Sequence, residues 1–143
     1  MHRAIVAALA AACAVRAAAA DPAAADAAKT YRLSTDGSAT ALAVGKQGML
    51  VVAFEPLSKG VHVDPKAPLR IRVETSGGLR AAKGELRRSD AVDPQAENPR
   101  FEIPVSAVGA GAQTAKVSLD FFVCTDSWCA KQARVLEYAV AVR

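Results

Sequence analysis

Apolar and polar side chains alternate along several short segments of this chain. In residues 69–74 the apolar side chains take every second position and charged side chains take the others. Residues 115–124 follow the same rule, with Val117, Leu119, Phe121 and Val123 on one parity. A period of two is typical of β-strands that bury one face. These segments therefore predict strands.

The whole pattern predicts an all-β domain. Predicted strands cover residues 48–54, 69–75, 101–105, 115–124 and 134–142. Proline residues at 56, 65, 68, 94 and 99 separate them, and no convincing amphipathic helix interrupts the series. Residues 58–68 and 89–99 are predicted to be surface loops, and Gly77–Gly78 a tight turn. Short strands spaced by turn signals indicate an immunoglobulin-like antiparallel β-sandwich.

The first twenty residues have the pattern of a secretory signal peptide. His2 and Arg3 precede an apolar stretch at 4–15, and Ala18–Ala20 forms an A-x-A cleavage site. The apolar stretch is shorter than the roughly 20 residues that span a bilayer. We therefore expect an exported, periplasmic protein. The segment before Cys13 also loosely resembles a lipobox, so a lipid anchor at Cys13 is the alternative.

Behind the predicted signal peptide, the chain divides into a tether and one domain. Residues 21–29 are rich in alanine and have no aromatic side chain, which predicts a flexible tether. Residues 30–143 have a length that suits one β-sandwich domain. Removal of residues 1–20 lowers the formal net charge from +4 to +2, because Arg3 and Arg16 are lost. A charge this small does not indicate a nucleic-acid partner.

Cys124 and Cys129 lie at the end of the predicted strand at 115–124, with four residues between them. In an oxidising compartment two such thiols form a disulfide unless a partner reduces them. A ring of about six residues stabilises a fold by only about 2 kcal/mol, against roughly 5–15 kcal/mol for a whole domain. The pair could be a redox pair or a modest structural staple, and both interpretations stay open.

Pairing the two cysteines across a hairpin sets a register for both strands. Lys116 then faces Glu137 and Val117 faces Leu136, which are favourable cross-strand pairs. Leu119 faces Arg134, a mismatch that a bulge at residues 131–133 would repair. Strand parity places Cys124 with the polar residues, on the outer side of its sheet or at the rim.

The residues between and beside the cysteines could control access to the sulfurs. Trp128 could shield a sulfur, dock on a partner, or serve as a rim anchor of the core. Asp126 within the ring and Lys131 just beyond it are charged neighbours that could tune a thiol.

Four segments in order carry a family resemblance: GVHVDP at 60–65, APLRIRV at 67–73, RFEIPV at 100–105, and LDFFVC at 119–124 followed by Cys129. Over roughly residues 48–142 the chain resembles the N-terminal periplasmic domain of the bacterial thiol:disulfide interchange protein DsbD. The resemblance implies an immunoglobulin-like sandwich with a redox pair on a late hairpin. Such a domain takes electrons from a membrane electron carrier and passes them to thioredoxin-like periplasmic proteins.

The resemblance also implies roles for the cysteines. Cys124 and Cys129 would be the exchange pair of a thiol-disulfide oxidoreductase, and partners would attack Cys129, the C-terminal member. The competing hypothesis is a non-catalytic envelope β-sandwich that mediates interactions and has a structural hairpin disulfide.

Other chemistries find less support in the sequence. His62 is the only histidine after residue 20, so a metal site would need His62 and Met49 to converge on the cysteines. No G-x-S-x-G motif accompanies His62, and the carboxylates are scattered. We therefore expect no cofactor and no metal.

Overall fold

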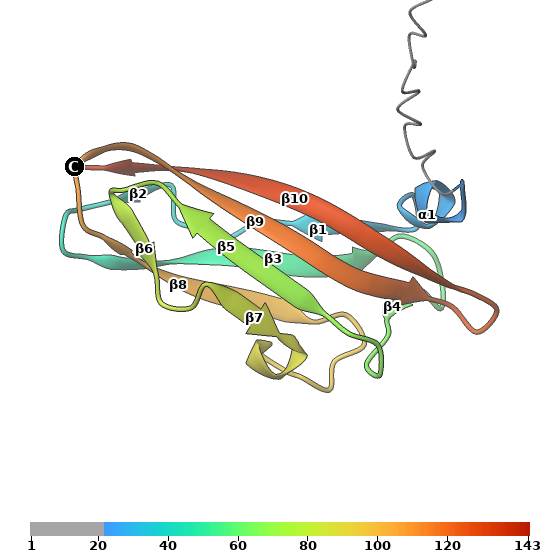
Figure 1. Cartoon of the computed structure of the whole chain (residues 1–143). Coiled ribbons are helices and arrows are strands. Elements are labelled where there is room, and N and C mark those ends of the chain that lie inside the picture. Colours follow the sequence, from blue (N-terminus) through green and yellow to red (C-terminus); the bar gives the residue numbers. More distant parts are fainter. Residues whose placement is uncertain (1–21) are drawn as a thin grey trace, which may run out of the picture.

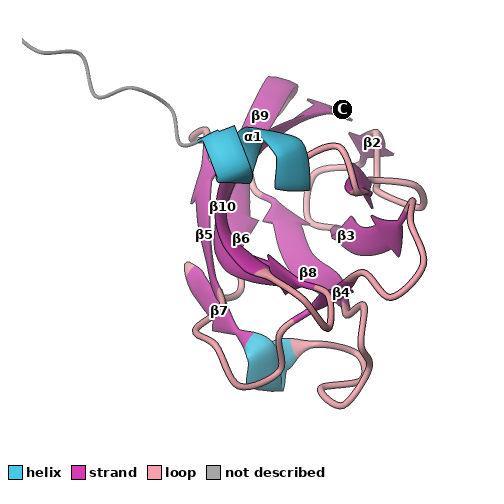
Figure 2. Ribbon diagram, turned by 90° about the vertical axis from the view of Figure 1, so that its right-hand side faces the viewer, coloured by secondary structure: helices cyan, strands magenta, loops and turns pink. Residues whose placement is uncertain are grey.

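The alternating segments form two β-sheets in the computed structural model, which describes residues 22–143 (Figure 1). One sheet contains β1 (Tyr31–Ser34), β3 (Gln47–Pro56), β8 (Arg100–Ala107) and β6 (Leu79–Ala81), in that order. The other contains β2 (Ala41–Leu42), β10 (Cys129–Val142), β9 (Gly111–Cys124), β5 (Arg70–Thr75) and β7 (Glu85–Arg87), in that order. Strand β4 (His62–Val63) pairs with the end of β9. Figure 2 shows the layer of β5, β9 and β10 beside the layer of β3 and β8.

The connections follow the immunoglobulin order. Seven strands correspond to strands A to G of an immunoglobulin domain, namely β1, β3, β5, β6, β8, β9 and β10. Strands β1, β3, β8 and β6 form one sheet, which is the order A-B-E-D, and β5, β9 and β10 form the other, which contains C, F and G. Strand β7 extends the second sheet beyond β5, and β2 pairs with β10 in parallel. The predicted immunoglobulin-like β-sandwich is confirmed.

The core lies between the sheets and is filled by residues of the inward parity. Phe121 of β9 packs edge-on against Phe54 of β3 and Tyr31 of β1, with ring centroids 4.8 and 5.5 Å away. Phe101 of β8 meets Phe54 at 6.5 Å, also edge-on. Edge-to-face contacts of this kind add stability beyond the area they bury. The aromatic cluster therefore joins both sheets.

The five predicted strands are confirmed as β3, β5, β8, β9 and β10, several with longer bounds. Gly77 and Gly78 form the predicted turn between β5 and β6. In the predicted loop at 89–99, the first two residues belong to the short 3₁₀ helix Arg88–Asp90, and residues 91–99 form the loop. The prediction of a plain loop at 58–68 is wrong in its middle. There Val61 and Val63 are buried, and β4 pairs with β9.

Residues 22–27 correct the expectation of a tether, because they form the helix α1 (Pro22–Ala27) beside β10 (Figure 1). Ala27 is buried, and the amide of Ala28 donates to the carbonyl oxygen of Ala24 at 3.0 Å. The predicted signal peptide and the lipid anchor at Cys13 lie outside the described residues. Within residues 22–143, no helix has the length and apolar character that a membrane crossing requires.

Candidate functional site

The candidate site lies at the turn between β9 and β10, where Cys124 and Cys129 form a disulfide. The two residues are direct cross-strand partners, with Cα atoms 4.1 Å apart. The predicted register is confirmed, because Lys116 pairs with Glu137 and Val117 with Leu136. From Cys124 to Gly111 every residue of β9 has one partner on β10. The disulfide therefore closes a long, regular hairpin.

The expected bulge at residues 131–133 is absent from the β9–β10 ladder, which is described over its whole length. Arg134 does face Leu119, as predicted. Its guanidinium lies 5.5 Å from the centroid of the Tyr31 ring, and Nη1 donates to the Tyr31 hydroxyl oxygen at 3.2 Å. A cation–π contact and a hydrogen bond thus satisfy the arginine on the inner face. No shift of register is needed.

The tip of the hairpin is a tight turn with Asp126 and Ser127 at its apex. The amide of Thr125 donates to the carbonyl oxygen of Trp128 at 2.8 Å. The amide of Ser127 donates to the Thr125 hydroxyl at 3.2 Å. Asp126 is exposed, and the Trp128 side chain is 38% exposed beside the disulfide. The tip thus presents an aromatic surface next to the sulfurs.

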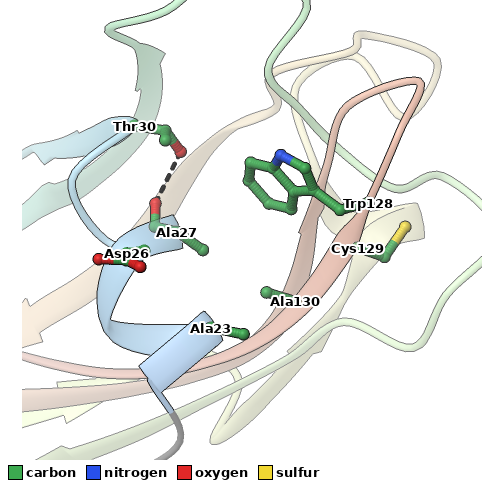
Figure 3. Close-up of a pocket in the computed structure, with 7 residues that line it drawn as sticks. All are labelled: Ala23, Asp26, Ala27, Thr30, Trp128, Cys129 and Ala130. Carbon is green, nitrogen blue, oxygen red and sulfur yellow. Dashed lines mark hydrogen bonds between the residues drawn. The ribbon is translucent and has the colours of Figure 1, made fainter.

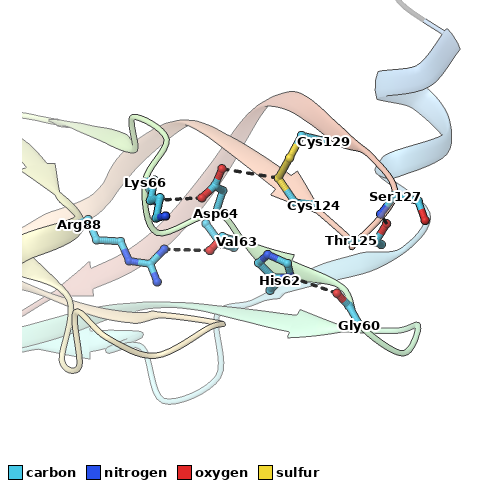
Figure 4. Close-up of a disulfide and its surroundings, with 10 residues drawn as sticks. All are labelled: Gly60, His62, Val63, Asp64, Lys66, Arg88, Cys124, Thr125, Ser127 and Cys129. Atoms are coloured by element: carbon cyan, nitrogen blue, oxygen red, sulfur yellow. Dashed lines mark hydrogen bonds between the residues drawn. A yellow bond between two sulfur atoms is a disulfide. The ribbon is translucent and has the colours of Figure 1, made fainter.

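The two cysteines differ in their exposure to solvent. Cys124 is 3% exposed, whereas Cys129 is exposed. Parity does place Cys124 on the outer face, but the expectation of an accessible position there is wrong. His62 of β4 is the cross-strand partner of Cys124 in the same sheet, and the Asp64 side chain, just after β4, lies beside the Cys124 sulfur (Figure 4). Of the two cysteines, Cys129 is therefore the one open to solvent.

Asp64 is the charged residue nearest to the buried sulfur. Its Oδ2 lies 3.8 Å from Cys124 Sγ (Figure 4). Its Oδ1 accepts a hydrogen bond from the amide of Lys66 at 2.9 Å, and its own amide donates to the carbonyl oxygen of Phe122 at 3.0 Å. These bonds fix the carboxylate on β9. Sequence reasoning assigned Asp64 no role, since nothing in the sequence places residue 64 beside residue 124.

Arg88 holds the β4 segment in place from the other side. Its Nη1 donates to the carbonyl oxygen of Val63 at 3.0 Å, and its Nε donates to that of Pro94 at 3.0 Å. Its Nη2 also contacts the carbonyl oxygen of Ala96. Burial lowers the pKa of Arg88, and the nearby carboxylate of Asp64 opposes that shift. One guanidinium therefore ties the loop before β8 to the strand that pairs with the end of β9.

An apolar cavity of about 370 Å³ lies between α1 and the start of β10 (Figure 3). Cys129 and Trp128 form one wall, and Ala23, Ala27 and Ala130 contribute to the rest. Its polar lining consists of Asp26 and Thr30, and the Thr30 hydroxyl donates to the Ala27 carbonyl oxygen at 2.6 Å. Cys129 thus borders a mainly apolar pocket, with its sulfur pointing away from α1 (Figure 3).

A polar network attaches α1 beside this cavity. Gln132 is only 4% exposed; its Oε1 accepts from the Tyr31 hydroxyl at 2.8 Å, and its Nε2 donates to the Ala24 carbonyl oxygen at 3.0 Å. Burial raises the pKa of Tyr31, while the hydrogen bond from Arg134 opposes this shift. Sequence reasoning missed the network. The signal was present, because Gln132 and Arg134 occupy the inward parity of β10.

The residues considered for a metal site are only partly brought together. His62 pairs with Cys124 in the β4–β9 ladder, but Met49 pairs with Pro104 in the other sheet. Asp64, rather than Met49, lies beside the two cysteines. One carboxylate oxygen of Asp64 and the Sγ atoms of Cys124 and Cys129 all lie within 4.8 Å of one another.

No family model and no curated protein matches the chain. Domains 4 and 5 of the S-layer protein SbsC are 11% identical to it, with a TM-score of 0.46 over 78% of this chain and 50% of that one. The alpha-2-macroglobulin of E. coli is 15% identical, with a TM-score of 0.48 over 79% of this chain and 7% of that one. A conjugative transposon lipoprotein from Bacteroides eggerthii is 12% identical, with a TM-score of 0.44 over 78% of this chain and 96% of that one.

The chain thus spans half of the S-layer fragment and a small part of the macroglobulin. Similarities this weak say nothing about activity, and the fold assignment rests on the strand order described above. The site must therefore be interpreted from its own chemistry.

Proposed function

We propose that this chain is an exported thiol-disulfide exchange module. It would relay electrons through Cys124 and Cys129, to or from thioredoxin-like periplasmic proteins or a membrane electron carrier. The proposal agrees with the resemblance to the N-terminal domain of DsbD, and it places the protein in the periplasm.

The unequal exposure of the two cysteine residues is the observation that carries the proposal. Exchange needs one sulfur that an incoming thiolate can reach and a second that stays with the protein as the resolving thiol. Cys129 is exposed and borders the apolar cavity, whereas Cys124 is 3% exposed and lies between its β4 and β10 partners. Cys129 therefore suits the role of the attacked sulfur.

The exchange proceeds in two steps. A thiolate of a partner dithiol attacks Cys129 Sγ, a partner–Cys129 disulfide forms, and the Cys124–Cys129 bond breaks with its electron pair on Cys124. The second partner thiolate then attacks the partner sulfur of the mixed disulfide. This step releases Cys129 as a thiolate and leaves the partner oxidised. Two electrons have moved to this domain, and the reverse sequence passes them to the next disulfide.

Asp64 would act on the leaving sulfur of Cys124. Its Oδ2 lies 3.8 Å from Cys124 Sγ, so the Cys124 thiol of the reduced protein can donate a hydrogen bond to it. Trp128 and the cavity would receive the apolar residues that flank the partner's cysteine.

The alternative function is a non-catalytic envelope module with a structural disulfide. The burial of Cys124 favours this reading, because one of the two sulfurs is closed to direct attack. The reduction potential separates the two functions. Exchange pairs lie between about −270 and −120 mV, whereas structural disulfides lie below about −300 mV.

The test is the redox equilibrium of the protein carrying Cys13→Ser, measured against graded glutathione and dithiothreitol buffers by thiol alkylation and mass. We expect a midpoint in the range of exchange proteins. A midpoint below about −300 mV would remove the proposed relay and leave the structural alternative.

Single-cysteine variants test the assignment of roles. In the Cys13→Ser background, Cys124→Ala leaves only the Cys129 thiol, which should form mixed disulfides with an oxidised thioredoxin-fold protein. With Cys129→Ala the buried Cys124 thiol should react at least about tenfold more slowly, because access controls reactivity. Equal rates, or faster reaction at Cys124, would contradict the assignment.

A further inference from the structure

We propose that reduction of the disulfide creates a zinc site formed by Cys124, Cys129 and Asp64. The three residues come from the end of β9, the start of β10 and the segment after β4 (Figure 4). Their ligand atoms already lie within 4.8 Å of one another. The proposal rests on the proposed function only for the source of electrons, since any dithiol that opens the bond creates the site.

The donor set favours zinc over harder cations. Two thiolates and one carboxylate are ligands of Zn²⁺, whereas Ca²⁺ and Mg²⁺ select oxygen ligands alone. Bond lengths of about 2.3 Å to sulfur and about 2.1 Å to oxygen give a sulfur–oxygen edge of about 3.6 Å around a tetrahedral ion. Asp64 Oδ2 and Cys124 Sγ are 3.8 Å apart in the oxidised protein. This edge of the site therefore exists before the metal binds.

The sulfur–sulfur edge forms only on reduction. In the disulfide the two sulfurs are bonded to each other and offer no thiolate. A dithiol donor supplies two electrons and two protons, becomes a disulfide, and leaves Cys124 and Cys129 as thiols. Zinc then binds both sulfurs as thiolates and releases two protons. Rotation of the side chains on directly opposed residues can separate the sulfurs to about 3.8 Å, the edge expected for two thiolates on zinc.

The third ligand is oriented by the protein. The backbone amide of Lys66 donates to Asp64 Oδ1, and the Asp64 amide donates to the Phe122 carbonyl oxygen. Outer contacts of this kind orient a ligand before the ion arrives. Because none of them involves the cysteines, they can persist in the reduced protein. The exposed side at Cys129 leaves the fourth position to water, as in zinc sites with three protein ligands.

The test compares metal binding by the reduced and the oxidised full chain in a Cys13→Ser background. After reduction with a dithiol and its anaerobic removal, Zn²⁺ is titrated against a chromophoric chelator. Co²⁺ serves as a spectroscopic probe for thiolate charge-transfer bands. We expect one ion per reduced chain with thiolate bands, and no binding at this site in the oxidised chain.

Asp64→Asn and Asp93→Asn form a matched pair of variants. Asp93 is exposed, lies outside the cluster, and its Oδ1 accepts the amide of residue 95 at 2.9 Å, as Asp64 does for residue 66. Asp64→Asn should weaken zinc binding at least about tenfold, and Asp93→Asn should leave it unchanged. Circular dichroism of both variants verifies that the fold is retained.

Two outcomes would overturn the zinc site: a reduced chain that binds no zinc in a one-to-one ratio, and equal affinities of the two variants. The relay is judged separately, from the reduction potential measured without metal. Zinc binding together with a potential typical of structural disulfides would keep the site and remove the relay. A suitable potential without zinc binding would do the reverse.

Discussion

The two ends of the sandwich are held together by different chemistry (Figure 1). At the end away from the disulfide, Gln113 joins the turn between β5 and β6 to the start of β9. Its Oε1 accepts from the Ser76 hydroxyl at 2.6 Å and from the Gly78 amide at 3.0 Å. The amide of Val108 also donates to the Gly78 carbonyl oxygen at 2.9 Å. This end is closed by hydrogen bonds between close-packed turns.

The disulfide end has a covalent bond, a cavity and a partly exposed tryptophan instead. Its polar groups, Asp64 and Gln132, hold segments around the sulfurs. The two ends should therefore respond differently to substitution. At the far end the turns pack closely against each other, whereas at the disulfide end the covalent ring is so short that it adds only about 2 kcal/mol.

The largest effect is expected at the far end, from Gly78→Ala. A Cβ at residue 78 would lie 2.1 Å from Gln113 Nε2 and 2.5 Å from the Gly109 carbonyl oxygen. We expect a loss of about 3 kcal/mol in the free energy of unfolding, measured by urea denaturation. The control is Gly77→Ala, where nothing lies within 4 Å of the new methyl group, and the change should stay within about 0.5 kcal/mol. Equal effects of the two variants would show that the far end is not closely packed.

Removal of the disulfide should lower the free energy of unfolding by less than Gly78→Ala does. The variant with Cys124→Ala and Cys129→Ala should lose about 2 kcal/mol, because the closed ring is short. Amide hydrogen exchange at Gly78 and Val108 should remain as slow as in the parent protein. A larger loss, or faster exchange at the far end, would mean that the bond supports the whole fold and would count against a redox role.

Tyr31→Phe should have a smaller effect, confined to the disulfide end. It leaves Gln132 Oε1 and Arg134 Nη1 without the hydroxyl that each contacts, which should cost about 1 to 1.5 kcal/mol. Hydrogen exchange of the Ala28 amide should become faster, since Gln132 would hold α1 less firmly. Tyr138→Phe is the control, because its hydroxyl donates to the Val51 carbonyl oxygen at 2.7 Å. It should destabilise the core by a similar amount without affecting Ala28.

The smallest effect is the pH-dependent stabilisation from Asp90, in the 3₁₀ helix that also contains Arg88. A hydrogen bond from Lys83, together with the amide of Arg87, lowers the pKa of Asp90 below the usual 3.8. This stabilisation is therefore present above pH 3.8 and is lost as the pH falls through the lower pKa of the folded state. Because the Lys83 side chain is 60% exposed, Asp90→Asn should cost only about 0.5 kcal/mol at neutral pH. The difference from the parent should shrink as the pH falls below 3.8, and a difference that does not change with pH would contradict the assignment.

The sequence predicted the long strands, in which apolar and polar residues alternate several times. Long strands show many alternations, so β3, β5, β8, β9 and β10 could be identified, and the cysteine pair set the register of the last hairpin. Strands of two to four residues, such as β4, show too little alternation to be recognised. The helix α1 escaped prediction because tertiary contacts, rather than its own alanine-rich composition, hold it in place.

The site was predictable in its cysteines and not in its surroundings. The proximity of Cys124 and Cys129 follows from four intervening residues and a strand pattern. Asp64 lies sixty positions from Cys124, and only the pairing of β4 with β9 brings them together. The burial of Cys124 has the same cause, so parity alone placed it on the correct face but with the wrong accessibility.

The parallel pairing of β2 with β10 has a consequence for the order of folding during synthesis. Ala41 and Leu42 pair with Ala141 and Val142, so the earliest strand of the second sheet waits for the last residues of β10. Cys129, at the opposite end of β10, is made before those residues and already has its β9 partner beside it. A ribosome therefore supplies the hairpin tip first, and the edge formed by β2 can be added only when nearly the whole domain has emerged.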